Sequence, residues 1–223
     1  MKPAVRRTTL AVDVVVFSPR SDALAVLLIR SPAGARERWS LPWDAPQGGE
    51  ALEDAAARIA SAVLGVAPAF FEQVGALSDG RRHPGDADVS IGIAALSPAG
   101  AGAPTEDAVW FPLSGLPALA PRHRVIVDRA AAVVRQRVDQ SPLAFRLLPP
   151  TFTLSDLQSV YELLLGRRLH KASFRRALQA SYLVEPTDEW RSEGRGRPAQ
   201  LFRYAPRKRR GARRGVRFDL FTE

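Results

Sequence analysis

The predicted order of strands and helices changes at Pro149-Pro150, and this change constrains the fold more than any other feature of the sequence. Proline lacks a backbone N–H and cannot continue a helix, so the pair ends one structural segment. Before it, strand patterns alternate with helix patterns, which indicates an α/β domain. After it come two short helix patterns and a basic segment. We therefore predict two domains, residues 1–145 and residues 146–223.

The excess of positive over negative charge lies entirely in the second part of the chain. The whole sequence has 32 Lys and Arg, 23 Asp and Glu, and a formal net charge of +9. Residues 1–142 contain 15 basic and 15 acidic side chains, whereas residues 143–223 contain 17 basic and 8 acidic ones. Such an asymmetry indicates a neutral unit joined to one that faces a polyanion. A solubilising tail is an equally good interpretation for 207–217 alone, but the basic residues of 167–203 are interleaved with helix and strand patterns.

The composition excludes several classes of protein. Apolar residues make up 46% of the chain, which is enough for a buried core and argues against extended disorder. The absence of Cys excludes a disulfide scaffold, a thiolate metal site and a Cys nucleophile. The longest apolar run, Ala23–Ile29, is too short to cross a bilayer, and no signal-peptide pattern opens the chain. We expect a soluble, cytoplasmic protein.

Apolar periodicity predicts the elements of the first domain. The expected strands are 10–17, 23–29, 70–76, 89–96 and 109–112. The expected helices are 52–64 and 123–138. Turn residues in Ser18–Asp22 indicate a hairpin between the first two strands. The segment 31–46, which holds the isolated Trp39 and Trp43, is expected to be a loop, as is the polar segment 78–88.

Residues 44–66 resemble the signature of the Nudix family. That signature reads Gly, five residues, Glu, seven residues, Arg-Glu, an aliphatic residue, any residue, Glu-Glu, any residue, Gly and an aliphatic residue. Anchored on Glu50, it crosses the segment without insertion or gap, and Arg58, Gly65 and Val66 also match, while Asp44 stands at the opening Gly. The resemblance implies a Nudix-like α/β/α sandwich with a mixed sheet.

The three remaining glutamates of the signature are replaced by Ile59, Ala62 and Val63. Their spacing of i, i+3 and i+4 places them on one face of the expected helix. In Nudix hydrolases this face presents carboxylates to Mg²⁺, which needs oxygen ligands. We therefore predict no catalytic residues, no metal, no cofactor and no metal-dependent hydrolysis. We expect the three positions to pack in the core, and Glu50 and Arg58 to keep a structural pairing.

The resemblance to ADP-ribose-processing Nudix proteins implies a nucleotide ligand between the sheet and the loops that flank the signature helix. The matching residues here are Arg30, Arg36, Trp39, Arg82 and His83. Arginine suits a diphosphate because its planar guanidinium bonds two oxygens at once. Trp39 either stacks on a base or packs under the sheet, and packing is the favoured interpretation for a single Trp. The family's Arg-Asp-Pro-Arg-Gly is Arg-His-Pro-Gly-Asp at 82–86, so one acidic residue and one Arg are absent.

The second domain follows the order of a winged helix-turn-helix, with a helix, a tight turn, a second helix and a basic hairpin. We expect the first helix to run from its cap Ser155 to Leu165 and the second, the recognition helix, to cover Lys171–Ala180. The side chains expected in the core are Phe174, Leu178 and Tyr182. The predicted DNA contacts are Lys171, Ser173, Arg175 and Arg176 in the recognition helix, and Arg195 and Arg197 in the wing. The basic residues of a single helix are commonly just a solvated surface. Here the helix, the wing and the charge imbalance occur together, which favours DNA binding.

A degenerate Nudix domain followed by a winged helix is similar to the Nudix-related transcriptional regulators of NAD metabolism, the NrtR type. Residues 152–158 and 161–162 are similar to that family's linker and first DNA-binding helix. The resemblance implies a homodimeric repressor that binds a palindromic operator in double-stranded DNA and is released by ADP-ribose or a related nucleotide. Three alternatives remain: a regulator of sugar catabolism with a different effector, a residual hydrolase of nucleoside diphosphate derivatives, and a sequence-nonspecific DNA-binding protein.

Overall fold

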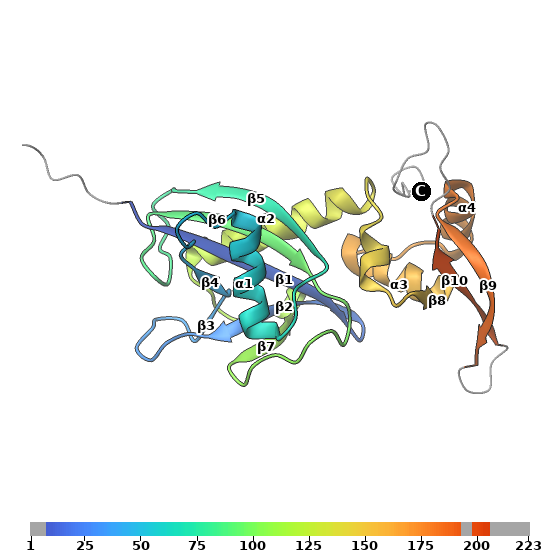
Figure 1. Ribbon diagram of the computed structural model, residues 1–223, viewed down its shortest axis with the longest axis horizontal. Helices are drawn as coiled ribbons and strands as arrows, with labels where there is room; N and C mark the ends of the chain where they lie inside the picture. The colour runs from blue at the N-terminus through green and yellow to red at the C-terminus, as the bar shows by residue number, and fades with distance from the viewer. Residues whose placement is uncertain (1–7, 193–197, 206–223) are drawn as a thin grey trace, which may run out of the picture. The chain divides into compact units, whose positions relative to one another are not determined.

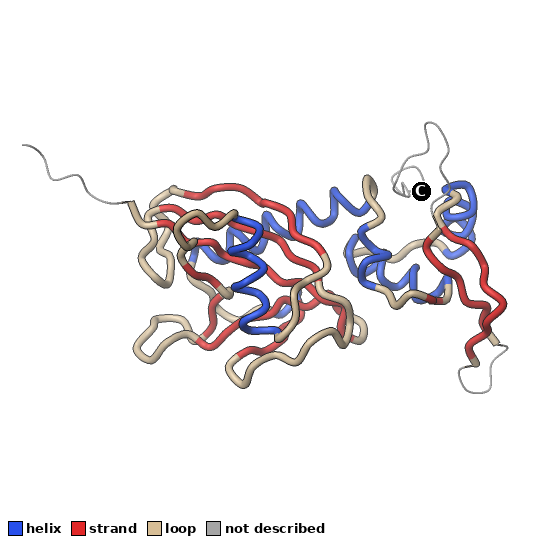
Figure 2. Tube along the Cα trace, in the orientation of Figure 1, coloured by secondary structure: helices blue, strands red, loops and turns tan. Residues whose placement is uncertain are grey.

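The computed structural model describes residues 8–192 and 198–205, which fall into two compact units, 1–133 and 134–223. The division lies inside helix α2 (Pro121–Val138), earlier in the chain than residue 145. A boundary after residue 145 would separate the ring of Phe145 from those of Tyr161 and Tyr204, which it contacts at centroid distances of 6.5 and 4.6 Å. Strands dominate the first unit, and the second combines helices with a small sheet (Figure 2).

The first unit is built on a mixed seven-stranded sheet (Figure 1). Its strands are β1 (Leu10–Arg20), β2 (Ala23–Arg30), β3 (Trp39–Ser40), β4 (Trp43–Asp44), β5 (Phe70–Leu77), β6 (Val89–Leu96) and β7 (Ala108–Pro112). β1 and β2 form the predicted antiparallel hairpin, and β1 runs parallel to β6 on its other side. β5 pairs with β6, β7 and β3 pair with β2, and β4 pairs with β1. The segment 31–46, expected to be a loop, therefore contains two short strands.

One helix covers each face of this sheet (Figure 1). Helix α1 (Leu52–Leu64) packs against alternate residues of β1, among them Val12 and Val14. Helix α2 lies on the opposite face, where Gly92 of β6 allows close approach, because a Cβ at this position would lie 3.0 Å from Ile126 Cγ2. The short helix η1 (Leu113–Gly115) precedes α2. The predicted α/β/α sandwich is confirmed.

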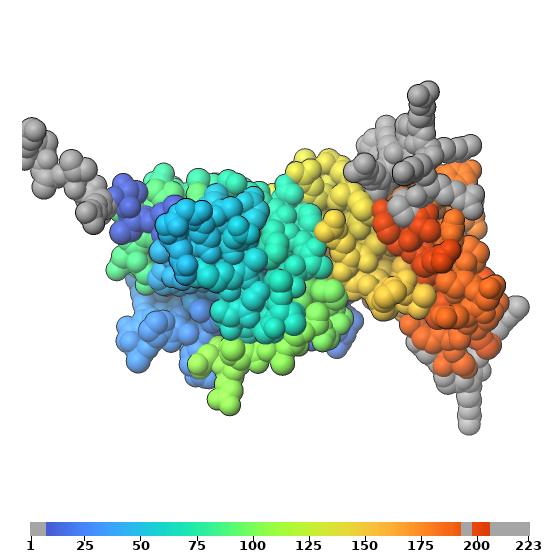
Figure 3. Space-filling model, viewed as in Figure 1, coloured from blue at the N-terminus to red at the C-terminus, as the bar shows by residue number. Residues whose placement is uncertain are grey.

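Helix α1 has the predicted bounds. It ends at Gly65, whose φ of 78° is left-handed and whose N–H donates to the carbonyl of Ser61 at 2.8 Å. The acidic Glu53 and Asp54 lie in its first turn, where negative charge complements the helix dipole. The outer side of this helix lies on the molecular surface, in the light-blue region of Figure 3.

The second unit has the predicted order of a winged helix. Its elements are η2 (Leu143–Leu147), β8 (Thr151–Phe152), α3 (Leu154–Leu165), α4 (Lys171–Ser181), β9 (Val184–Arg191) and β10 (Ala199–Tyr204). The three strands form one antiparallel sheet in the order β8-β10-β9. Phe152, Tyr161 and Phe174 are fully buried and form the centre of a small aromatic core. Among the described residues, no helix has the length and apolar character needed to cross a membrane.

Two details of this unit differ from the sequence prediction. Thr153, not Ser155, caps α3: its hydroxyl accepts from the N–H of Asp156 at 3.1 Å, and Asp156 accepts from the N–H of Thr153 at 2.8 Å. The expectation that Tyr182 faces the core is also wrong. Tyr182 follows the last turn of α4 with a left-handed φ of 55°, which turns its side chain outward, and it is 48% exposed.

Candidate functional site

The face of α1 that carries the metal ligands in Nudix hydrolases has no carboxylate. Ile59 is 5% exposed and belongs to the core, and Val63 packs against that core. Ala62 is exposed, so the expectation that all three positions pack inside is wrong at this one. Successive helical residues turn by 100°, which carries Ala62 away from the sheet while Ile59 and Val63 stay beside it. This face therefore offers no oxygen ligands for Mg²⁺.

Glu50 and Arg58 keep the expected structural pairing. Arg58 Nε donates to Glu50 Oε1 at 2.9 Å, and Arg58 Nη2 donates to Glu50 Oε2 at 3.0 Å. The Arg58 hydrogen bonds, together with the backbone N–H of Gln47, hold the pKa of Glu50 at about 2. Arg58 Nη1 also donates to Asp44 at 2.7 Å, so the residue at the signature's opening Gly supplies a second acceptor. The remaining signature residues thus hold the loop before α1 onto the helix.

A buried polar network that the sequence analysis missed lies on the opposite face of the sheet. Asp13 of β1, His83 and His123 are all at most 1% exposed. Asp13 Oδ1 accepts from His83 Nε2 and from His123 Nε2, each at 2.9 Å. Burial raises the pKa of Asp13, but the hydrogen bonds from His123 and His83 outweigh it and hold that pKa well below its usual value. Asp13 is therefore an ionised carboxylate inside the protein.

Backbone N–H groups fix the proton on each ring of this network. The N–H of Leu41 donates to His123 Nδ1 at 3.1 Å, and the N–H of Gly85 donates to His83 Nδ1 at 3.0 Å. Each Nδ1 is thus an acceptor, and each Nε2 carries the hydrogen directed at Asp13. Burial lowers the pKa of His123, which keeps its ring neutral.

This donor set does not fit a metal ion. Asp13, His83 and His123 form a group of three possible ligand residues in the described part of the chain, with ligand atoms within 4.8 Å of one another. Ligation through Nε2 would remove a ring proton from each histidine while its Nδ1 still accepted a backbone N–H, which leaves imidazolates. The arrangement is a hydrogen-bond network that ties β1, the loop 78–88 and α2 together.

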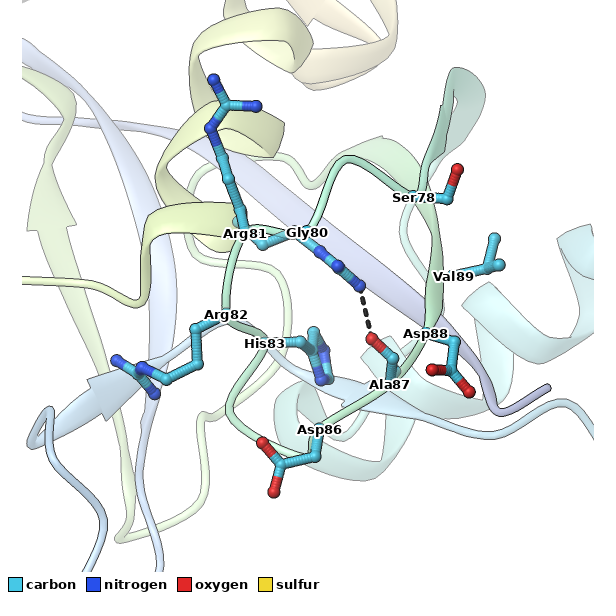
Figure 4. A pocket seen from close by; sticks show the side chains of 10 residues that line it. Ser78, Gly80, Arg81, Arg82, His83, Asp86, Ala87, Asp88 and Val89 are labelled. Atoms are coloured by element: carbon cyan, nitrogen blue, oxygen red, sulfur yellow. Dashed lines mark hydrogen bonds between the residues drawn. The ribbon is translucent and has the colours of Figure 1, made fainter. Parts of the chain in front are cut away.

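The loop 78–88 borders a hollow of about 480 Å³ (Figure 4). The residues that line it are Ser78, Gly80, Arg81, Arg82, His83, Asp86, Ala87, Asp88, Val89 and Arg122. Trp43 supports the loop, because its ring lies edge-on to His83 at a centroid distance of 4.7 Å. A Cβ at Gly85 would lie 2.0 Å from the Trp43 ring, so only glycine fits there.

The predicted effector residues occupy two adjoining places. Arg30 and Trp39 pair across β2 and β3, and the Arg30 guanidinium lies 5.6 Å from the Trp39 ring centroid. Trp39 packs edge-on against Phe111 at 5.0 Å and is only partly buried, so it packs and also keeps part of its surface accessible. Arg36 is exposed in the loop that follows β2.

The other two predicted effector residues lie in the loop 78–88. Arg82 forms an ion pair with Glu37, which connects its loop to the loop that carries Arg36. The His83 side chain is completely buried and bonded to Asp13, so it has no surface to offer a ligand. Its side chain holds the loop 78–88 to β1, and a part in effector binding stays a prediction.

The predicted recognition helix α4 presents basic side chains to solvent. Lys171, Arg175 and Arg176 are exposed, while Phe174 and Leu178 are buried, as expected. Ser173 is half-buried, with its hydroxyl 3.3 Å from His170 Nδ1. No acidic residue lies in the first turn of the helix. Gln179, which the sequence analysis did not select, is also exposed, three residues beyond Arg176, and shares its face.

The described part of the wing holds its arginines in ion pairs. Arg191 Nη2 contacts both carboxylate oxygens of Asp156 at 2.8 Å, which fastens β9 to the first turn of α3. Arg203 pairs with Glu185 at 3.4 Å. The two wing residues predicted to contact DNA, Arg195 and Arg197, lie outside the described residues.

Two family models match this chain: the NUDIX domain at residues 7–130 and the NrtR DNA-binding winged helix domain at residues 144–204. The chain is 32% identical over 206 residues to a protein of Acinetobacter baylyi named ADPR responsive transcriptional repressor NtrR, covering 88% of this chain and 82% of that protein. The chain belongs to the NrtR family. This confirms the resemblance seen in the sequence.

Solved structures agree with this assignment. NrtR of Shewanella oneidensis complexed with a 27mer DNA matches with a TM-score of 0.76 and 30% identity, over 88% of this chain and 94% of that one. A MutT/nudix family protein from Enterococcus faecalis matches with a TM-score of 0.69 and 20% identity, over 92% and 89% of the two chains, which shows the shared fold alone. The NrtR-family fold thus extends over both units of this protein.

Proposed function

We propose that the protein is a transcriptional repressor of NAD metabolism genes, active in the cytoplasm. In this proposal it binds a palindromic operator as a homodimer and leaves it when ADP-ribose or a related nucleotide binds the first unit. The observation that carries the proposal is the pairing of a Nudix unit without metal ligands and an NrtR winged helix in one chain. The named function of the Acinetobacter baylyi relative, and the DNA in the Shewanella oneidensis complex, support it.

DNA binding is assigned to α4 and the wing. The exposed Arg175 and Arg176 stand on a helix without acidic residues in its first turn, so phosphates or guanine edges are suitable partners. A single winged helix covers only a few base pairs, and useful specificity calls for two copies on a symmetric site. The proposed DNA contacts remain Lys171, Ser173, Arg175, Arg176, Arg195 and Arg197.

Effector binding is assigned to the first unit. Arg36 is exposed, and Arg30 is half-exposed beside the Trp39 ring. Arg82 forms an ion pair with Glu37, which lies next to Arg36 in the chain. A ligand here changes DNA affinity only if it favours one relative placement of the two winged helices in the dimer. The protein is proposed to act without hydrolysing the nucleotide, because α1 lacks the carboxylates that would hold Mg²⁺.

The test begins with selection of bound sequences from random duplexes, followed by fluorescence anisotropy on the selected operator and on random DNA. Arg175→Gln and Arg176→Gln should lose more affinity for the operator than for random DNA, by about 1–3 kcal/mol for a bidentate contact to guanine. The exposed Arg124→Gln in the first unit changes the same charge and should leave both affinities unchanged. Equal losses on both DNAs would contradict the assignment of α4 as the reading helix.

Effector response is measured on the same operator with ADP-ribose added. Arg36→Ala and Arg82→Ala should keep operator affinity and lose release by ADP-ribose. Light scattering should give a dimer with and without the operator, and a monomer in both conditions would refute the proposed mode of binding. Turnover of ADP-ribose with Mg²⁺ at about 1 s⁻¹ or faster would instead make the protein a hydrolase.

A further inference from the structure

Arg122 is a buried cation beside the hollow of the loop 78–88. It is the second residue of α2 and is only 3% exposed. Its Nη1 donates to the carbonyl of Ala87 at 2.5 Å, the bond drawn as a dashed line in Figure 4. Its backbone N–H donates to the carbonyl of Arg82 at 3.3 Å. Its buried Nε has no hydrogen-bond partner in the described part of the chain.

Within the described residues, no carboxylate serves as a counter-charge for this guanidinium. No carboxylate among residues 8–192 and 198–205 forms an ion pair with Arg122. Arginine keeps its proton in proteins, and a buried charge is costly unless an opposite charge and hydrogen bonds compensate it. The start of a helix is the positive end of its dipole, so the position of Arg122 adds to the local positive potential.

The other charged side chains at the hollow are already engaged or point elsewhere. Arg81 pairs with Asp79, and Arg82 pairs with Glu37. Asp88 Oδ2 accepts from both the N–H and the hydroxyl of Thr9, at 3.0 Å each. The exposed carboxylate of Asp86 extends away from Ala87 (Figure 4). None of these groups neutralises Arg122.

We propose that the hollow binds a phosphate group, with Arg122 as its counter-charge. Phosphate oxygens accept strongly from guanidinium N–H groups, and Arg122, which lines the hollow, has a guanidinium Nε without a partner in the described part of the chain. At about 480 Å³ the hollow is in the range of small-molecule sites, so it has room for a phosphate that is part of a larger molecule. The occupant is either a phosphate of the nucleotide effector, in which case the site rests on the proposed function, or free inorganic phosphate.

A bound phosphate has a direct mechanical consequence in this geometry. Arg122 already holds the loop 78–88 through Ala87 and Arg82, and His83 and His123 join the same loop and helix through Asp13. An anion on Arg122 therefore lies where the loop and the first turn of α2 are already joined. Occupation of the site should stiffen both segments together.

The experiment measures thermal unfolding of the full chain against inorganic phosphate at constant ionic strength. Phosphate should raise the Tm of the wild-type protein. Arg122→Gln should weaken phosphate binding about tenfold or more, the loss expected for a hydrogen bond to a charged group. Arg124→Gln is the matched control, since Arg124 lies on the same turn but is 52% exposed and pairs with Asp128. Equal phosphate shifts in all three proteins, or no shift in any, would overturn the proposal.

Competition identifies the occupant. If the nucleotide supplies the phosphate, inorganic phosphate competes with ADP-ribose in calorimetry, and Arg122→Gln also weakens ADP-ribose binding. If the two ligands bind together, the site serves free phosphate. If phosphate binding depends on Arg122 but ADP-ribose does not release the operator, the proposed function is refuted and the phosphate site is supported. If ADP-ribose releases the operator and phosphate has no effect on the Tm, the phosphate site is refuted and the proposed function is supported.

A second measurement needs no variant, in case Arg122→Gln does not fold. Amide hydrogen exchange of the wild-type protein, with phosphate or with chloride at equal ionic strength, should show protection by phosphate in residues 80–89 and 122–126. The matched segment is Val12–Phe17 of β1, which lies in the same unit and should not change. Absence of protection in the loop and in the start of α2 would refute the site.

Discussion

Asp13 offers the most discriminating test of the buried network. The substitution Asp13→Asn keeps the shape of the side chain and removes its charge. The protein favours the ionised form of this group, as its lowered pKa shows, so a neutral amide must cost stability. The amide oxygen can still accept from His83 and His123, but the new NH₂ group occupies the place of Oδ2, which has no partner in the described structure.

The magnitude follows from these contacts. Two hydrogen bonds to a charged acceptor become two to a neutral one, at a cost of about 1 kcal/mol each. The buried NH₂ without an acceptor costs about 1–3 kcal/mol more, and loss of the buried charge offsets part of this. Both histidines donate toward Asp13, so neither ring can accept from the new NH₂. We expect Asp13→Asn to lower the free energy of unfolding of the first unit by about 3 kcal/mol.

The assay is urea unfolding followed by tryptophan fluorescence in a Trp190→Phe background. The remaining tryptophans then all lie in the first unit, and Trp43 contacts His83 directly. The control is Ser90→Ala on the neighbouring strand β6, because the buried Ser90 hydroxyl has no partner in the described structure and its loss should cost under about 1 kcal/mol. A cost below about 1 kcal/mol for Asp13→Asn, or equal costs for both variants, would refute the reasoning.

Two further predictions concern pH and the apolar face of α1. Burial lowers the pKa of His123, so the unfolded chain takes up this proton before the folded protein does, and the free energy of unfolding should fall below about pH 6.5, by at most about 1.4 kcal/mol per pH unit for this group. In urea titrations between pH 7 and 5, His123→Gln should make the free energy of unfolding less dependent on pH. An unchanged dependence would contradict the network. Ile59→Glu should lower the free energy of unfolding by about 3 kcal/mol or more, whereas Ala62→Glu at its exposed position should lower it by less than about 0.5 kcal/mol. Neither variant should hydrolyse ADP-ribose with Mg²⁺. Equal losses of stability in thermal unfolding would show that the two positions are not packed as described.

The sequence by itself determined the local elements and the chemistry that is missing. Periodicity predicted α1 and β6 with the bounds that the structure shows, because residues that repeat with the period of a helix or strand bury one side of it wherever the element packs. The loss of three glutamates at Ile59, Ala62 and Val63 was visible without any structure. The charge asymmetry and the order of elements after Pro149-Pro150 were equally local properties.

Only the tertiary structure decided which polar residues meet. Asp13 lies 70 residues from His83 and 110 from His123, and no spacing rule connects them, although a lone carboxylate within the apolar strand 10–17 was a signal that a partner must exist. Arg122 lies just before the expected helix 123–138, and only the loop 78–88 folded over it makes it a buried cation. Local patterns report which side of an element is apolar, whereas burial of a charge depends on segments that come from elsewhere in the chain.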